Sequence, residues 1–218
     1  MHLRSTVLAI LAFSGASMAA QWSVGCRAGL NLATISGDVE DEFLTMNPGL
    51  HAAADVELGL GKWLGLRSGI AYTMKGARWS YDRENAEGEE SGAHDDTKAS
   101  YLEIPLSLQF RPPVSWKIKP YVSFGPALGL FLGAQKTVKV DGEEVYSATR
   151  NEGARNVDLG LTAGGGAGVR VGPGEILLEV CFTWGLLTVD ASGDEYVVNR
   201  ALSITLGYSL PLGRREAP

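Results

Sequence analysis

Beyond its first 20 residues, this chain of 218 residues has no run of about 20 consecutive apolar residues, the length that a membrane-crossing helix needs. It has only two cysteines, too few for a disulfide scaffold or a convincing zinc site. Its formal net charge of −6 argues against a nucleic-acid partner. A membrane β-barrel stays possible because it needs only alternate residues to be apolar. The 28 glycines remain to be explained.

The first 20 residues predict a cleaved secretory signal peptide rather than part of the fold. Arg4 supplies a positive charge, 6–13 (TVLAILAF) form a short apolar core, and 14–20 (SGASMAA) end in small residues. Cleavage after Ala19 or Ala20 suits this pattern. The alternative is a buried N-terminal strand or helix. We therefore expect an exported protein.

From Trp22 onwards, apolar residues alternate with small or polar ones, which predicts strands with two different faces. Eight segments follow this pattern: 22–32, 48–60, 63–75, 100–111, 118–133, 157–171, 175–185 and 200–210. Most are longer than the 5–6 residues that are typical of ordinary strands, and ~9–11 residues suffice for a tilted strand in a membrane. We predict an all-β fold, an eight-stranded antiparallel up-and-down transmembrane β-barrel over 21–211, with a short tail at 212–218.

The connections between these segments alternate in length. Long external loops are expected at about 33–47, 76–99, 134–156 and 186–199, and short turns at 61–62, 112–117 and 172–174. Outer-membrane barrels have short periplasmic turns and long external loops, so both termini are expected to be periplasmic. The part from 76 to 98 is rich in acidic residues and predicts a solvated loop without calcium-loop spacing.

Aromatic residues gather near both ends of the predicted strands, as interfacial side chains do in membrane barrels. They are Trp22, Trp63, Trp116 and Tyr208 at the periplasmic end, and Tyr72 and Trp184 at the opposite end. An alternative is that they cap a soluble core. Most strand glycines lie on the polar face, where small residues leave room for charged side chains in a narrow barrel.

Six charged residues on the polar faces predict an ion-pair network inside the barrel. They are Arg27, Asp55, Glu57, Arg67, Glu103 and Glu179. A charge in a narrow lumen cannot keep its full hydration and therefore needs a partner. If 61–63 form a hairpin turn, Glu57 lies opposite Arg67, and we expect these two to pair.

No pattern of residues supports catalysis. His51 and Asp55 share a strand face but lie about 13 Å apart, so we interpret His51 as a hydrogen-bonded interior residue. The run 164–168 (GGGAG) has no following helix to make a phosphate site. Cys26 and Cys181 have opposite predicted facings, which disfavours a disulfide. We expect no enzyme activity, cofactor or metal.

Several segments, in this order, resemble the PorT-like outer-membrane barrels that are common in Bacteroidetes. They are 27–38 (RAGLNLATISGD), 72–78 (YTMKGAR), 101–110 (YLEIPLSLQF), 120–132 (PYVSFGPALGLFL), 158–169 (DLGLTAGGGAGV) and 199–210 (NRALSITLGYSL). The resemblance implies an eight-stranded barrel in the outer membrane and suggests a link to secretion. The expected partners are outer-membrane lipid, lipopolysaccharide, the outer-membrane assembly machinery and a secretion-system or surface partner, with no nucleic acid.

The expected function is therefore that of a non-enzymatic outer-membrane barrel, with a lumen filled by side chains and a structural, adhesive or secretion-associated role. Two alternatives stay open. One is a soluble exported ligand-binding barrel like a lipocalin, which would turn its apolar face inward. The other is a membrane lipid hydrolase or acyltransferase that would depend on His51.

Overall fold

A computed structural model describes residues 21–38, 44–84, 90–140, 143–149, 154–190 and 196–212. The predicted signal peptide at 1–20 and the tail beyond Leu212 lie outside these residues. Within the described ranges, no helix is both long enough and apolar enough to cross a membrane.

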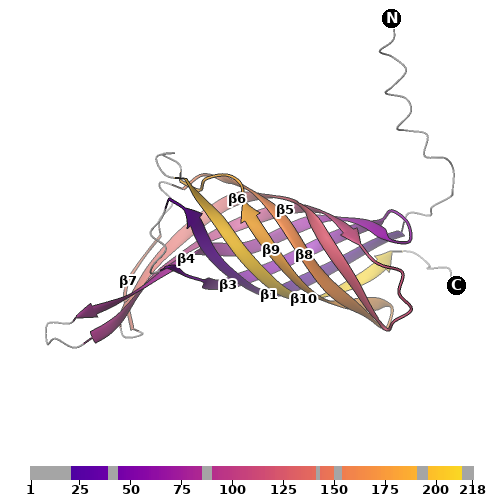
Figure 1. Cartoon of the computed structure of the whole chain (residues 1–218), viewed down its shortest axis with the longest axis horizontal. Helices are drawn as coiled ribbons and strands as arrows, with labels where there is room; N and C mark the ends of the chain where they lie inside the picture. The colour runs from indigo at the N-terminus through magenta and orange to yellow at the C-terminus, as the bar shows by residue number, and fades with distance from the viewer. Residues whose placement is uncertain are drawn as a thin grey trace, which may run out of the picture.

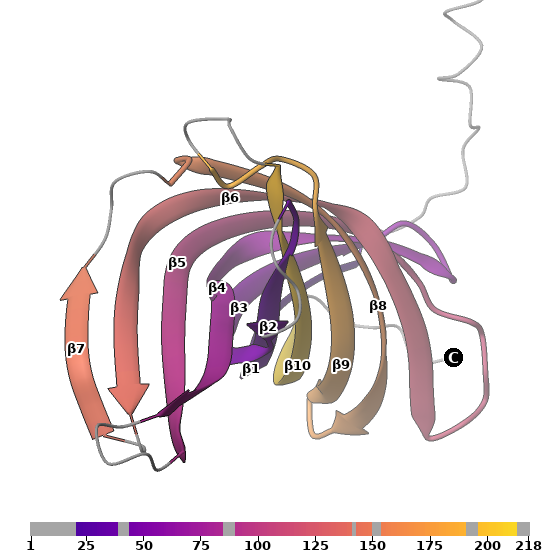
Figure 2. The same cartoon turned by 60° about the vertical axis from the view of Figure 1, so that its left-hand side comes forward.

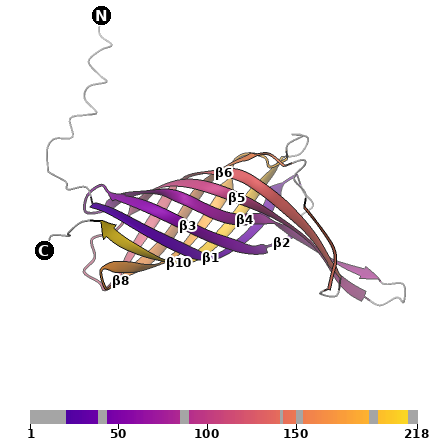
Figure 3. The same cartoon turned by 180° about the vertical axis from the view of Figure 1, so that it is seen from behind.

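Eight long strands pair edge to edge and close into a ring (Figures 1 and 3). In order around the ring they are β1 (Gln21–Gly37), β3 (Asn47–Gly59), β4 (Leu64–Glu84), β5 (Glu90–Phe110), β6 (Ile118–Val140), β8 (Val157–Val171), β9 (Gly174–Gly185) and β10 (Val197–Leu212). β10 pairs with β1 to complete the ring, and every neighbouring pair is antiparallel. The ring agrees with the predicted eight up-and-down strands.

β4, β5 and β6 continue past one end of the ring and form a sheet that projects from it (Figures 1 and 2). The pairing of β6 with β8 stops at Leu130 and Val157, but β6 stays paired with β5 as far as Val140. β7 (Glu143–Thr149) adds to the outer edge of β6, and β2 (Leu44–Thr45) adds to β4. We call β7 and the parts of β4, β5 and β6 at 76–84, 90–98 and 135–140 the extended sheet.

The prediction of long loops at 76–99 and 134–156 is wrong, because most of these residues belong to the extended sheet. The β4–β5 ladder runs without a gap from Ala71 and Glu103 to Glu84 and Glu90. An ion pair of 2.5 Å between Arg78 and Asp96 joins the two strands. Charged side chains lie on both faces of this part of the sheet, as Asp95 and Asp96 do, so these strands carry little of the apolar alternation that marks the ring. The expected loops at 33–47 and 186–199 are shortened too, since β1 reaches Gly37 and β10 begins at Val197.

The three short connections, at 60–63, 111–117 and 172–173, lie at the end of the ring where β1 begins and β10 ends, on the right in Figure 1. We call this the turn end. Gly61 and Gly172 in these turns have φ angles of 132° and 62°, which L side chains rarely adopt. The turn end matches the end that was predicted to be periplasmic.

The two faces of the ring have opposite chemistry. Apolar side chains of the alternating pattern point outward and are exposed, as for Leu30 and Leu206 at 60% each. Polar side chains point inward and are buried, as for Gln109 at 0% and Glu179 at 5%. A soluble lipocalin-like barrel needs the reverse arrangement, so the structure contradicts that alternative.

Candidate functional site: the interior charge network

All six charged residues of the predicted network point into the ring. They are Arg27 on β1, Asp55 and Glu57 on β3, Arg67 on β4, Glu103 on β5 and Glu179 on β9. Their side chains are exposed by at most 16%. Each occupies an inward position of its strand because the side chains of a strand alternate between its two faces. They belong to three clusters along the ring.

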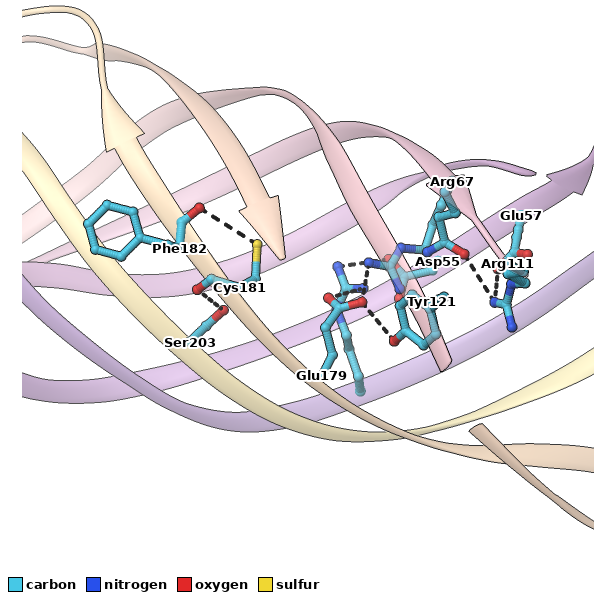
Figure 4. A network of polar contacts seen from close by, with 11 residues as sticks. Asp55, Glu57, Arg67, Arg111, Tyr121, Glu179, Cys181, Phe182 and Ser203 are labelled. Carbon is cyan, nitrogen blue, oxygen red and sulfur yellow. Dashed lines mark hydrogen bonds and ion pairs between the residues drawn. The ribbon is translucent and has the colours of Figure 1, made fainter. Parts of the chain in front are cut away.

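The middle cluster is centred on the carboxylate of Glu179 (Figure 4). Arg67 donates to Glu179 Oε2 at 2.6 Å, and the hydroxyl of Tyr121 donates to the same oxygen at 2.8 Å. Arg27 lies 3.4 Å from Glu179 Oε1 and 3.3 Å from Asp55. Two arginines, two carboxylates and a phenol from five strands thus meet inside the ring.

A second cluster lies toward the turn end and is centred on Arg111, just beyond the end of β5. Its guanidinium contacts Glu57 at 2.9 Å and Glu175 at 3.3 Å, and it donates to Gln109 Oε1 at 3.0 Å. It also lies 4.9 Å from the ring centre of Tyr121, whose hydroxyl belongs to the middle cluster. The aromatic ring therefore connects the two clusters.

The expected pair between Glu57 and Arg67 is not formed, although the two residues lie directly opposite each other in the β3–β4 ladder as predicted. Arg67 instead reaches across the lumen to Glu179 on β9, and Glu57 binds Arg111. In a narrow ring, a long side chain reaches strands that are not its neighbours, so strand register alone does not identify its partner.

The third cluster lies on the other side of the middle cluster and is centred on Lys75. Its ammonium contacts Glu103 at 2.5 Å and Asp158 at 2.9 Å, and its side chain is 3% exposed. Asn199 donates to the carboxylate of Asp158 at 3.0 Å. The ring of Tyr101 lies 5.3 Å from the ammonium. Every charge in this cluster has an oppositely charged partner.

Sequence reasoning missed four charged members of these clusters: Lys75, Arg111, Asp158 and Glu175. Lys75 and Asp158 occupy inward positions of the predicted segments 63–75 and 157–171, so the alternating pattern carried enough signal to find them. Arg111 and Glu175 lie at strand ends next to turns, where facing is hard to assign from alternation.

Little space remains beside the middle cluster. A cavity of about 20 Å³ lies among Arg27, Asp55, Arg67, Tyr121 and Glu179, room for about one water molecule. The charged side chains thus fill the middle of the ring.

The predicted aromatic belts consist of outward-facing or half-buried residues near the two ends. At the turn end, Trp22, Trp63 and Trp116 are 46%, 51% and 67% exposed, and the hydroxyl of Tyr208 donates to Val171 O at 3.0 Å. Toward the extended sheet, the hydroxyls of Tyr72 and Ser100 form a hydrogen bond of 2.9 Å. Trp184 packs edge-on against Phe182, with ring centres 4.4 Å apart.

The other candidate residues show no arrangement for chemistry. His51 lies opposite Gly29 and Thr73 in its two ladders, and Asp55, on the same strand, is engaged by Arg27. Cys26 and Cys181 are free thiols. Across the part of the chain that the structure describes, no group of three His, Cys, Asp or Glu side chains is placed to hold a metal ion.

The comparisons with known proteins place the chain among outer-membrane proteins. Residues 14–190 match the family described as outer membrane protein beta-barrel domain. No curated protein matches the sequence.

Several solved structures resemble the chain in fold. A major outer membrane protein from Thermus thermophilus is 16% identical, with a TM-score of 0.51, over 89% of this chain and 100% of that one. Neisserial surface protein A (16% identity, TM-score 0.48) aligns over 87% of this chain and 96% of its own. The attachment invasion locus protein Ail of Yersinia pestis (13% identity, TM-score 0.44) aligns over 86% of this chain and 98% of its own. At 16% identity, the likeness to the Thermus thermophilus protein supports the fold alone.

Proposed function

Because the chain belongs to the outer membrane protein beta-barrel domain family, we propose that its ring spans the outer membrane as a closed, non-enzymatic anchor. This anchor holds the extended sheet outside the cell in a structural or adhesive role. The observation that carries the proposal is the set of ion-paired clusters that fills a ring whose outer face is apolar.

The outer face supports the membrane placement. Lipid-facing positions of a membrane barrel are apolar, and its backbone polar groups are all paired within a closed sheet. Both features are present here, since outward residues such as Leu30, Ile70 and Leu206 are 57–60% exposed on a ring with no open edge between β1 and β10. Trp22 at the start of β1 and Trp63 in the β3–β4 turn suit a water–lipid interface.

The interior supports the lack of conduction. A barrel of eight strands has an interior just wide enough for side chains to fill. Here bulky charged side chains from several strands meet in its middle and bind one another. An ion crossing the ring would have to displace buried salt bridges, each of which is costly to break.

The orientation follows from the two ends. Short turns face the periplasm and long projections face outward in outer-membrane barrels, so the turn end is periplasmic and the extended sheet is external. In this orientation the ring contacts outer-membrane lipid and lipopolysaccharide and is inserted by the outer-membrane assembly machinery. Any surface partner meets the extended sheet. Membership of the PorT-like group, with its link to secretion, remains part of the proposal and rests on the six resembling segments.

Cysteine labelling of intact cells tests this function. In a background with Cys26→Ser and Cys181→Ser, Glu144→Cys marks β7 and Lys62→Cys marks the β3–β4 turn as a matched control. A membrane-impermeant maleimide should label the first variant on intact cells and the second only after lysis. Both should fractionate with the outer membrane and migrate faster unheated than boiled. Recovery in the soluble periplasm, or labelling of Lys62→Cys on intact cells, would contradict the proposal.

A further inference from the structure

We propose that β7 is a docking edge for a second copy of this chain, and that two β7 strands pair antiparallel to join two extended sheets. The ring has no free edge because each of its strands is paired on both sides. β7 differs: among the described strands it pairs only with β6, through residues 135–140. Its other edge therefore presents backbone donors and acceptors that an added strand would satisfy.

Beyond Glu143 and Glu144, the residues of β7 lack the usual protection against strand addition. Natural edge strands are often shielded by lysine, proline or inward charges. Val145–Thr149 (VYSAT) contains none of these, and Val145 and Tyr146 are 60% and 56% exposed. β7 lies beyond the last pair of β6 with β8, so it belongs to the projecting part of the molecule rather than to the ring wall (Figure 2). A solvent-exposed edge of this kind favours pairing with another strand.

The charge pattern of β7 identifies a second β7 as a suitable partner. The uncharged run Val145–Thr149 is centred on Ser147. Antiparallel pairing about Ser147 places Tyr146 against Ala148 of the partner and Val145 against Thr149 of the partner. Glu144 then lies outside the run, so the acidic side chains of the two copies do not face each other. The three central pairs, at Tyr146, Ser147 and Ala148, lie in the regular part of β7. The register shift between β6 and β7 lies between Glu144 and Tyr146, outside these pairs.

Symmetry supplies a further reason for this partner. Two identical edges that pair about a two-fold axis satisfy each other and leave no β7 edge for a third copy. The pairing therefore ends at a dimer, whereas an unpaired edge would remain open to aggregation.

Disulfide trapping in detergent tests the register. In the background with Cys26→Ser and Cys181→Ser, Ser147→Cys places two thiols directly opposite each other, with Cα atoms about 5 Å apart, which suits a disulfide. Val145→Cys is the matched control, because its two copies would lie about 13 Å apart along the strands. Mild oxidation should give about tenfold more covalent dimer with Ser147→Cys than with Val145→Cys. Unheated gels confirm that both rings are folded.

A charge-swap pair tests the interface without cross-linking. A variant with Tyr146→Lys and Ala148→Lys sets like charges opposite each other and should be monomeric by light scattering, with its heat-dependent gel shift intact. A variant with Tyr146→Glu and Ala148→Glu should likewise be monomeric, and the two mixed together should form a heterodimer.

Three results would overturn the inference. They are equal trapping at 145 and 147, a lysine variant that dimerises as the parent does, and a parent protein that is monomeric at all concentrations. Binding of a different protein to β7 of such a monomer would reassign the edge to that partner. All these measurements are made in detergent, so they do not depend on which way the ring faces in a membrane.

Discussion

Removal of the Arg67 guanidinium should destabilise the ring by about 3 kcal/mol. Arg67 is 6% exposed and binds Glu179 at 2.6 Å, and breaking a buried ion pair typically costs about 3–5 kcal/mol because the remaining charge is stranded. Here Glu179 keeps the Tyr121 hydroxyl at 2.8 Å and Arg27 at 3.4 Å. We therefore expect Arg67→Met to fall at the lower end of this range. Methionine keeps an unbranched, apolar side chain in the same space.

Double mutants identify which carboxylate Arg67 stabilises. Adding Glu179→Gln to Arg67→Met removes the stranded charge and should recover about 1–2 kcal/mol. Adding Glu57→Gln should recover nothing, because Glu57 binds Arg111 instead. Strand register alone predicts the opposite result, since Glu57 lies opposite Arg67 in the ladder. The two double mutants therefore separate the network seen in the structure from the one expected from the sequence.

The assay is urea unfolding in detergent micelles or lipid, followed by tryptophan fluorescence and by the heat-dependent gel shift. Lys136→Met is the matched control, because Lys136 pairs with Asp95 in the extended sheet with side chains 34% and 20% exposed, and its loss should cost less than about 1 kcal/mol. A near-zero effect of Arg67→Met, or recovery by Glu57→Gln but not by Glu179→Gln, would refute the reasoning.

Three further predictions concern the outer face, the third cluster and the extended sheet. Leu206→Arg, on the outer face near mid-strand, should cost about 2–4 kcal/mol in lipid, while Ser203→Thr inside the ring should be much milder; equal costs would contradict the assigned facing. Lys75→Met should cost about 3–5 kcal/mol in the same unfolding assay because it leaves two buried carboxylates without a cation, and a solvated lysine would show almost no effect. Replacing 80–94 by a tight turn should preserve the gel shift, since both arms of the β4–β5 hairpin are shortened equally; its loss would mean that the ring needs the extended sheet to fold.

The ring could be predicted from the sequence because its strands obey one strong physical rule. Each must present apolar residues to one side and small or polar residues to the other, so alternation marks both the strands and their facing. The predicted segment 157–171 matches β8 at both ends, and 175–185 matches β9 to within one residue. The short turns were found for the same reason, since the alternation stops there.

The extended sheet could not be predicted in this way. Where β4 and β5 leave the ring, charged side chains lie on both faces, and pairing depends on backbone hydrogen bonds and on local pairs such as Arg78 with Asp96. The residues at 76–98 are acidic and polar, which is also the composition of a solvated loop. Long-range partners inside the ring escaped prediction for a different reason. They depend on how far Arg67 and Lys75 reach across the lumen, and this follows from the curvature of the closed sheet.

Single-channel recording in planar lipid bilayers tests most directly whether the ring is closed. The purified protein, with folding confirmed by the gel shift and insertion confirmed by protease protection, should give no stable conductance steps at moderate voltage. A variant with Arg67→Gly and Glu179→Gly, which removes two of the five side chains of the middle cluster, should give more frequent conductance steps than the parent. Stable conductance by the folded and inserted parent protein would contradict the claim that the ion-paired clusters close the ring.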